Sequence, residues 1–325
     1  MNIRSYAFYM LVSIVLCTST HTKDFIFDFG GVLFLNNKLA SFRHIGMCNV
    51  AECSIRLRIN PLYIDQHIKK TLFVTLEKVA KVHDLNTDTT YHVAYDDKGN
   101  ALPFLLCAWL QGTMKATEIR ELVETTMSRH PEWFGCQAEQ RIIQNLVHMI
   151  LTPELFVDSV KVSDAGIAFV KRCKREGHKI YGLSNWDTES FALLKKNHPE
   201  LFDLFDGIIL SGQVHANKPH ETIYHTLLDR YQLQAENCWF IDDQKENVVA
   251  AQKLGINAVV HNQNFQKLIK NIRLAHAQSL SLRKDFTNHG STTPTSAKST
   301  NSAMIDGEKI SPTDSIDASC LPANE

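Results

Sequence analysis

Short apolar runs alternate with amphipathic stretches along much of this chain of 325 residues. The apolar runs are too short for buried helices and are bounded by polar residues or glycine, which is typical of buried parallel strands. We expect strands at 24–27, 179–183, 207–210, 238–241 and 258–261, and helices at 164–176, 221–231 and 248–254. Strands that alternate with helices in this way form a parallel sheet through right-handed crossovers. The pattern therefore predicts an α/β fold with a Rossmann-like parallel sheet at its core.

The pattern changes after the first predicted strand. Residues 36–160 contain mostly helical periodicity, which is clearest at 63–85, 116–130 and 139–151. Residues 91–100 have the composition of a loop or small hairpin around the turn Asp97-Lys98-Gly99-Asn100. The sequence thus predicts a helical region inserted between the first strand and the rest of the sheet.

The first 22 residues have the pattern of a secretory signal, with a charged start and an apolar stretch at 7–17. The apolar stretch is shorter than the roughly 20 residues of a membrane-spanning helix, so we expect no stable membrane anchor. Leu16 is too large for the position before a lipoprotein cysteine, which excludes a lipid anchor at Cys17. We expect export to a periplasm or to the outside if this segment is cleaved, and a cytoplasmic protein otherwise.

The other end of the chain is polar. From residue 282 to residue 325, Ser, Thr, Asn and Pro dominate and apolar residues are few. Such a segment buries too little surface to offset the entropy lost on ordering, so we predict a disordered tail.

Charge and cysteine content exclude only a few classes of function. The chain has 34 Lys and Arg against 35 Asp and Glu, and no basic block is interleaved with aromatic residues. A nucleic-acid partner is therefore not expected. Without Cys17 the cysteines are odd in number and irregularly spaced, which predicts no disulfide framework and argues mildly against an oxidising compartment. Cys107 and Cys238 lie in apolar runs, so we expect them in the core.

Four short stretches carry the candidate chemistry. They contain Asp28 in FIFDFGGVL, Ser184 in YGLSN, Lys218 followed by proline, and the pair Asp242-Asp243 in FIDD. The first, second and fourth stretches end predicted strands. An open parallel sheet binds its ligands beyond the carboxyl ends of its strands, so we expect these side chains to converge there.

The residue types suit phosphoryl transfer. The carboxylate of Asp28 can attack phosphorus and form an aspartyl-phosphate, which divides one difficult displacement into two easier ones. Asp28 and Asp243 offer hard oxygen ligands for Mg²⁺. Lys218 and Ser184 can stabilise the negative charge of the transferring group. The set predicts a Mg²⁺-dependent phosphatase for a small phosphorylated metabolite.

This set of stretches resembles the four motifs of the haloacid dehalogenase-like hydrolase superfamily, over about residues 23 to 263. The sequences DFGGV, LSN and DD followed by Asn247 look most like sugar-1-phosphate phosphatases and the phosphatase domain of soluble epoxide hydrolase. The resemblance implies that residues 36–160 form a helical cap, that Gly31 and Asn185 lie at the phosphate pocket, and that Asp242 supports the metal. We expect Asn247 to orient the acidic pair or the metal waters.

Gly30 departs from the superfamily pattern. Most phosphatases of the superfamily have a second Asp at this position, which protonates the leaving oxygen and later activates water. General acid-base catalysis is worth about 10²–10⁴-fold in rate. We hypothesise that the substrate has a good leaving group, such as an anomeric sugar phosphate, or that a cap residue or water replaces the acid. The backbone carbonyl of Gly30 remains a potential metal ligand.

Two alternatives to a phosphatase remain. Dehalogenases of the superfamily also lack the second Asp, but they use no metal and do not keep two adjacent acids after the fourth strand. A non-catalytic binding protein that keeps the fold is the second alternative, and Gly30 and the long cap favour it.

The histidines add little to the predicted site. His220 and His225 have one residue too many between them for a zinc-protease helix, so we do not expect zinc. His44, His67, His92 and His130 lie in the predicted cap, where they are either ordinary histidines or contributors to substrate binding.

We divide the chain into a signal-like segment 1–22, an α/β core of 23–35 and 161–275, a cap of 36–160 and a tail of 282–325.

Overall fold

The computed structural model describes residues 23–85, 91–262, 264–265 and 268. The predicted signal-like segment and the predicted tail lie outside these residues. Within the described ranges, no helix has both the length and the apolar character needed to span a bilayer.

Five parallel strands form the central sheet. They are β1 (Asp24–Phe27), β4 (Lys179–Ser184), β5 (Gly207–Leu210), β6 (Cys238–Asp242) and β7 (Asn257–Val260), in the order β5-β4-β1-β6-β7. Every neighbouring pair is parallel, so the predicted α/β fold is confirmed. β1 lies at the centre, paired with β4 on one side and β6 on the other. This order brings the ends of β1, β4 and β6 side by side.

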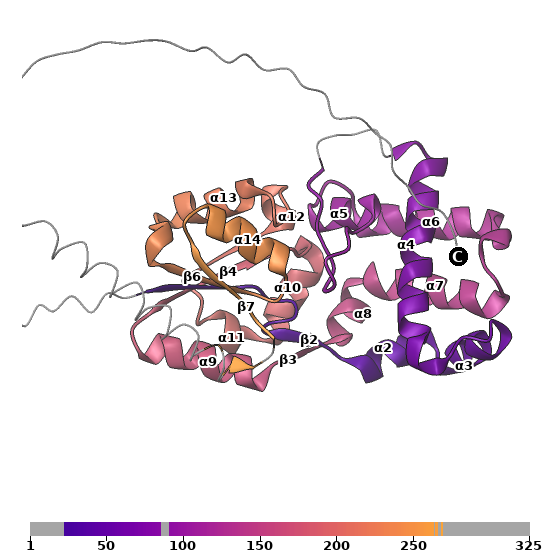
Figure 1. The fold of residues 1–325 in the computed structure, drawn as a ribbon, viewed down its shortest axis with the longest axis horizontal. Coiled ribbons are helices and arrows are strands. Elements are labelled where there is room, and N and C mark those ends of the chain that lie inside the picture. The colour runs from indigo at the N-terminus through magenta and orange to yellow at the C-terminus, as the bar shows by residue number, and fades with distance from the viewer. Residues whose placement is uncertain (1–22, 86–90, 263, 266–267, 269–325) are drawn as a thin grey trace, which may run out of the picture. The chain divides into compact units, whose positions relative to one another are not determined.

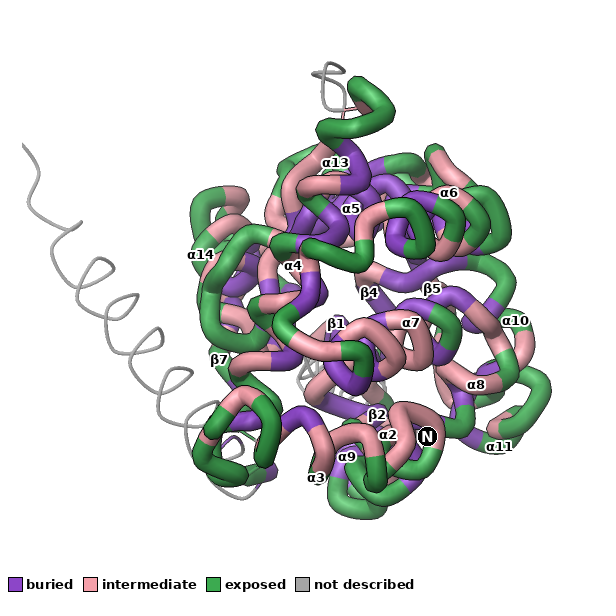
Figure 2. The backbone as a smooth tube through the Cα atoms, turned by 90° about the vertical axis from the view of Figure 1, so that its right-hand side faces the viewer, coloured by how far each residue is buried: buried purple, intermediate pink, exposed green. Residues whose placement is uncertain are grey.

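Helices cover both faces of the sheet (Figure 1). Ile26 of β1 packs in a cluster with residues of α13 (Glu221–Tyr231) and α14 (Lys245–Lys253). Phe25 and Phe27 contact Phe169 of α9 (Asp164–Arg175) instead. Because both faces are covered, successive residues are buried at 25–27 in β1, at 180–184 in β4 and along the whole of β6, as the purple tube beside the β4 label shows in Figure 2. This explains why the sequence has continuous apolar runs there.

The remaining helices of this part follow the sheet in chain order. They are α10 (Thr188–Asn197), α11 (Pro199–Phe202), α12 (Ser211–Val214) and the short 3-10 helix η4 (Ala235–Asn237). The predicted helix 248–254 begins earlier than expected, at Lys245. Cys107 and Cys238 are fully buried, as the apolar pattern predicted.

A second, antiparallel pair of strands was not predicted. β2 (Phe34–Asn36) pairs with β3 (Val160–Val162), so the chain segments that enter and leave the helical region run side by side. Asn36 lies opposite Val160 in this pair.

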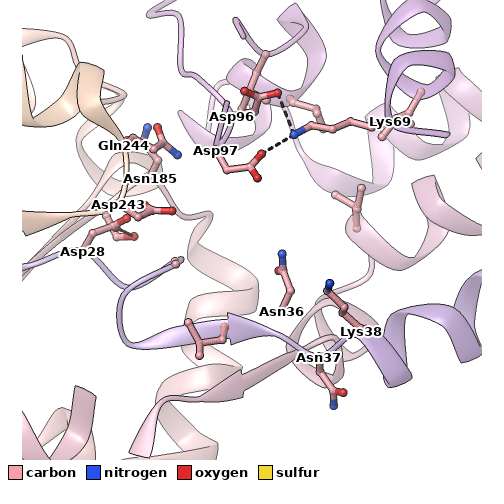
Figure 3. Close-up of a pocket in the computed structure, with 18 of the residues that line it drawn as sticks. Asp28, Asn36, Asn37, Lys38, Lys69, Asp96, Asp97, Asn185, Asp243 and Gln244 are labelled. Carbon is pink, nitrogen blue, oxygen red and sulfur yellow. Dashed lines mark hydrogen bonds and ion pairs between the residues drawn. The ribbon is translucent and has the colours of Figure 1, made fainter. Parts of the chain in front are cut away.

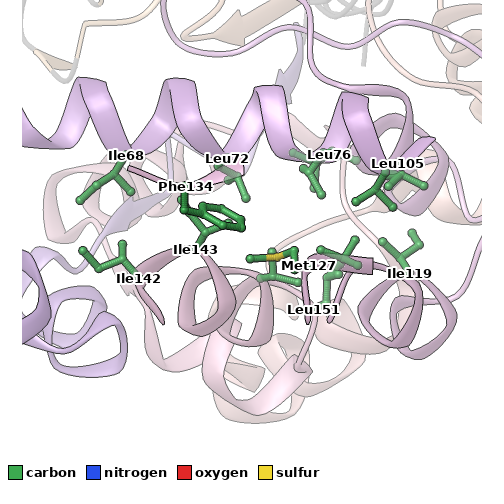
Figure 4. Packing of buried hydrophobic residues seen from close by; sticks show 14 of the residues in the cluster. Ile68, Leu72, Leu76, Leu105, Ile119, Met127, Phe134, Ile142, Ile143 and Leu151 are labelled. Atoms are coloured by element: carbon green, nitrogen blue, oxygen red, sulfur yellow. The ribbon is translucent and has the colours of Figure 1, made fainter. Parts of the chain in front are cut away.

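The helical region has a hydrophobic core of its own. Its helices are α2 (Lys38–Ile45), α3 (Met47–Arg56), α4 (Ile64–Val82), α5 (Phe104–Leu110), α6 (Ala116–Arg129), α7 (Gln137–Ile150) and α8 (Pro153–Asp158), with 3-10 turns η1 (Pro61–Tyr63) and η3 (Pro131–Trp133). Figure 4 shows Leu72 and Leu76 of α4 pointing toward Ile143 of α7 and Met127 of α6. The apolar side chains of these helices thus cover one another rather than the sheet.

Hydrogen bonds join this region to the segment that precedes Lys218. Asn217 donates its side-chain N–H groups to the carbonyls of His92 (2.9 Å) and Cys107 (3.0 Å). Gln111 donates from Nε2 to the carbonyl of His215 at 2.8 Å. The helical region is therefore anchored close to the predicted site.

Candidate active site

The ends of three neighbouring strands bring three of the predicted side chains together. Asp28 directly follows β1, Ser184 is the last residue of β4, and Asp242 is the last residue of β6. The Ser184 hydroxyl donates a hydrogen bond to Asp28 Oδ1 over 2.6 Å. All three residues are buried.

Lys218 lies between the acids, although its loop comes from a different part of the chain. The residue is 1% exposed. Its ammonium group lies 2.9 Å from Asp28 Oδ1 and donates to Asp242 Oδ2 at 2.6 Å and to the Leu183 carbonyl at 2.9 Å. An ammonium group has three protons, so these acceptors hold it in one position.

Asn185 fixes the backbone of Lys218. Its Oδ1 accepts a hydrogen bond from the Lys218 N–H at 2.7 Å, and its Nδ2 donates to the Lys218 carbonyl at 2.9 Å. The resemblance placed Asn185 at the phosphate pocket. Asn185 does line the cavity described below. Its two hydrogen bonds to the backbone of Lys218 also hold that residue in position.

The two adjacent acids have different surroundings. Both oxygens of Asp242 accept hydrogen bonds, from the Gln244 N–H, from Asn247 Nδ2 and from Lys218. Asp243 Oδ1 is buried and has no hydrogen-bond partner among the described residues. Asp242 is therefore satisfied by the protein alone, whereas Asp243 presents an oxygen that needs a donor or a cation.

Burial and the repulsion between neighbouring carboxylates raise the pKa values of Asp28 and Asp243. Burial raises the pKa of Asp28 to about 6, although Lys218 opposes this shift. Burial, together with repulsion from the nearby carboxylates of Asp28 and Asp242, raises the pKa of Asp243 to about 8. Burial also disfavours the charge of Lys218, but Asp242 and Asp28 outweigh it and raise the pKa of Lys218. Three acids around one lysine leave an excess of negative charge.

Gly31 leaves room for Asp243. Its φ is +70°, and a Cβ atom added there would lie 2.1 Å from Asp243 Oδ2. Glycine is thus required twice, for the backbone conformation and for the close approach. At Gly30, by contrast, an added Cβ would meet no atom within 4 Å. The departure from the superfamily pattern is therefore not imposed by lack of space.

The residues present fit a magnesium ion. One carboxylate oxygen from each of Asp28, Asp242 and Asp243 lies within 4.8 Å of the others. Mg²⁺ binds through one or two carboxylates and keeps several waters. The unpartnered oxygen of Asp243 and the excess negative charge are what such an ion would satisfy, with Asp28 and Asp243 as its protein ligands.

These side chains lie at one end of a cavity of about 1070 Å³ (Figure 3). The helical region contributes Lys69, Asp96 and Asp97, with Lys69 Nζ 2.9 Å from Asp96 Oδ2 and 2.6 Å from Asp97 Oδ1. Gln244, Asn36, Lys38 and Lys161 also line it. None of these residues was predicted as part of the site. The Asp97 turn was visible in the sequence, but its position over the strand ends depends on tertiary packing.

The four histidines of the predicted cap are absent from the residues that line this cavity in the described part of the chain. His44 bonds to Asp158, His67 to Glu139 and His130 to Glu132, while His92 stacks on His220. Among the described residues, the acid cluster is the one group of three or more metal-binding side chains, and His220 and His225 are not part of it.

Two curated fungal proteins share sequence with the chain. Sesquiterpene phosphatase astK of Aspergillus oryzae is 34% identical over 89 residues, which are 27% of this chain and 45% of that protein. Drimenol cyclase drtB of Aspergillus calidoustus is 27% identical over 120 residues, which are 35% of this chain and 22% of that protein. The chain thus spans less than half the length of these relatives.

Solved structures resemble the chain more distantly. A haloacid dehalogenase family enzyme of Bacteroides thetaiotaomicron, solved in complex with magnesium and inorganic phosphate, has 17% identity and a TM-score of 0.46 over 75% of this chain and 96% of its own. The sequence profile described as "Hydrolase: haloacid dehalogenase-like hydrolase" matches residues 23–255. This match covers most of the chain, so the protein belongs to the haloacid dehalogenase-like hydrolase family.

Proposed function

We propose that the chain is a Mg²⁺-dependent phosphatase that hydrolyses a phosphate monoester through an aspartyl-phosphate on Asp28. The observation that supports this most strongly is the set of contacts around Asp28. One of its oxygens, Oδ1, is held by Ser184 and Lys218, and the unpartnered acid Asp243 belongs to the same cluster. This arrangement fixes one carboxylate oxygen and leaves the other, to which none of the residues described here donates a hydrogen bond, able to react.

In the first step an oxygen of Asp28 forms a bond to phosphorus and the bond from phosphorus to the alcohol oxygen breaks. The alkoxide takes a proton from solvent water and leaves as the alcohol. In the second step water forms a bond to phosphorus and loses a proton to solvent, the bond from phosphorus to the Asp28 oxygen breaks, and inorganic phosphate departs, which restores the Asp28 carboxylate. Lys218 stabilises the charge of the transferring group through its positive charge, which is fixed beside Asp28, and the Ser184 hydroxyl can turn from Asp28 Oδ1 to donate to the phosphoryl oxygens.

Asp28 and Asp243 would hold the Mg²⁺ ion, whose charge allows the anionic nucleophile to approach the anionic phosphate. Asp242 and Asn247 act differently in this account. Asp242 holds Lys218, and Asn247 holds Asp242. The metal-free dehalogenase alternative gives no role to the unpartnered oxygen of Asp243.

The relative named a sesquiterpene phosphatase supports phosphate ester hydrolysis over dehalogenation. The shared segment covers only part of both proteins, so the reaction of this chain is a proposal that the comparison supports.

The proposal is tested with the purified full chain and a panel of phosphate monoesters, with Mg²⁺ and with EDTA. Hydrolysis should require Mg²⁺, and Asp28→Asn should lower kcat by roughly 10³-fold or more, as loss of a nucleophile does.

The matched control is Asp24→Asn, at the opposite end of the same strand. It should retain activity. Equal losses in both variants, or dehalogenation of a haloacid without metal, would contradict the proposal. Binding of a phosphate ester with no turnover would favour the non-catalytic alternative.

A further inference from the structure

We propose that the body of the substrate is an aliphatic hydrocarbon chain, so that the enzyme acts on an amphiphilic phosphate monoester. This inference rests on the proposed phosphatase activity and adds the substrate class. It differs from the sugar phosphate that we gave as an example of a good leaving group, and it follows from the wall of the cavity that faces the acid cluster.

The cavity has two chemically different ends. The strand ends supply the charged and polar groups around Asp28. The helical region supplies an apolar wall, made of Leu72 and Phe73 of α4, Leu106 of α5, and Leu146 and Ile150 of α7. Leu102, in the loop before α5, extends this wall.

The core of the helical region does not cover these apolar side chains completely. Phe73, Leu102, Leu146 and Ile150 are only partly buried, although they pack against the core of the helical region. Each therefore keeps apolar surface toward the cavity. Such surface gains free energy when a hydrocarbon covers it and displaces water.

The polar side chain that α4, α5 and α7 present to the cavity is already paired, whereas Lys38 of α2 and Lys161 of β3 also line it. Among the described lining residues from α4, α5 and α7, Lys69 is the one polar side chain, and it forms ion pairs with Asp96 and Asp97. Asp96 also accepts hydrogen bonds from Asn100 and the Lys98 N–H. A sugar body needs a hydrogen-bond partner for each buried hydroxyl, and these helices offer it leucine, isoleucine and phenylalanine.

The volume is consistent with a substrate much larger than a phosphate. The cavity of about 1070 Å³ lies at the upper limit of the roughly 300–1,000 Å³ typical of small-molecule pockets. A phosphate group bound at Asp28 would leave most of this volume to the body of the ester.

The test is a homologous series of linear alkyl phosphates from ethyl to decyl, kept below the concentrations at which they form micelles. Their leaving alcohols have nearly the same basicity, so the series varies the apolar surface alone. We expect kcat/KM to rise by roughly two- to fourfold for each added methylene until the cavity is filled, as burial of a methylene predicts. Glucose 1-phosphate should have a lower kcat/KM than decyl phosphate.

Two neighbouring residues of α4 provide a matched pair of variants. Phe73 lines the cavity, whereas Val74 is 39% exposed and does not line it. Phe73→Ser should lower the ratio of kcat/KM for decyl phosphate to that for ethyl phosphate at least fivefold, and Val74→Ser should leave this ratio unchanged. Ile150→Ser, on α7, repeats the test on a second helix in case Phe73→Ser unfolds.

The outcomes separate the substrate class from the activity itself. A rising series whose slope falls in Phe73→Ser or Ile150→Ser supports the inference. A flat series, or a preference for glucose 1-phosphate, overturns the inference and leaves the phosphatase proposal standing. No hydrolysis of any ester overturns both.

Discussion

Gly31 and Asp243 share one small space at the site: a Cβ atom at position 31 would lie 2.1 Å from Asp243 Oδ2. The acid can point into the cluster only because residue 31 has no side chain. Two adjacent glycines follow Asp28 and Phe29, yet only the second of them is sterically required.

We predict that Gly31→Ala destabilises the protein and that Gly30→Ala does not. Alanine at the positive φ of residue 31 costs about 1–2 kcal/mol, and displacement of Asp243 adds to this. Gly31→Ala should therefore lower the free energy of unfolding by at least that amount and weaken Mg²⁺ binding. Urea denaturation and calorimetric Mg²⁺ titration of both variants measure the difference. Equal free energies of unfolding for the two variants would contradict the account.

Gly30→Asp should add the general acid that the chain lacks. A Cβ at this position meets no atom within 4 Å, so the new side chain has room to reach the leaving oxygen. We expect a gain of up to about 10²–10⁴-fold in kcat for alkyl phosphates, whose leaving groups need protonation, and little gain for p-nitrophenyl phosphate. Gly30→Asn, of nearly the same size, should show no gain. A gain in Gly30→Asn as well would show that the effect is not acid catalysis.

Lys218→Met should destabilise the protein strongly. Lys218 is buried between Asp28 and Asp242, so its removal leaves buried carboxylates without their cation. Such a loss costs about 3–5 kcal/mol. The double variant Lys218→Met with Asp242→Asn should recover part of the loss, because it removes one of the unpaired charges. A double variant less stable than Lys218→Met alone would rule out this charge balance.

The effect of Mg²⁺ on stability should grow with pH. In the metal-free protein, the raised pKa values of Asp28, about 6, and Asp243, about 8, mean that the folded state binds protons more tightly than the unfolded state. Their contribution to stability is fully present below pH 3.8 and is lost as the pH rises through about 6 and about 8. Mg²⁺ offsets the charge that then develops.

The increase in Tm caused by a fixed Mg²⁺ concentration should therefore be larger at pH 8.5 than at pH 5.5. Thermal melts of the wild type and of Asp243→Asn at both pH values test this prediction. The variant should lose most of the difference, because its amide does not ionise. An increase in Tm that is equal at both pH values, or that persists in Asp243→Asn, would argue against Asp243 as a ligand.

The sequence predicted the strands and the residues at their ends because both faces of the sheet are covered by helices. An apolar run followed by a polar residue is then a direct sign of a strand that ends at a site, as at Asp28, Ser184 and Asp242. The antiparallel pair β2 and β3 was missed because each strand has three residues, too few to show a period, and Lys161 and Asn36 are polar.

The side of the cavity that the helical region forms was harder to predict for a different reason. α5 has the sequence FLLCAWL, which is apolar all round and therefore shows no amphipathic period. The ion pairs of Lys69 join residues 27 and 28 positions apart, from a helix and a loop. The pairing of Asn185 with the backbone of Lys218 also spans a long separation. Such contacts depend on how helices, strands and loops pack in space, and the spacing of residues along the sequence does not reveal this packing.

The most direct test of the account is an acid quench of the enzyme during turnover of a radiolabelled phosphate ester with Mg²⁺, followed by peptide mapping. We predict that the wild type retains labelled phosphate on the peptide that contains Asp28, that hydroxylamine releases it, and that Asp28→Asn retains none. Label on another residue, or full turnover by Asp28→Asn, would contradict the account.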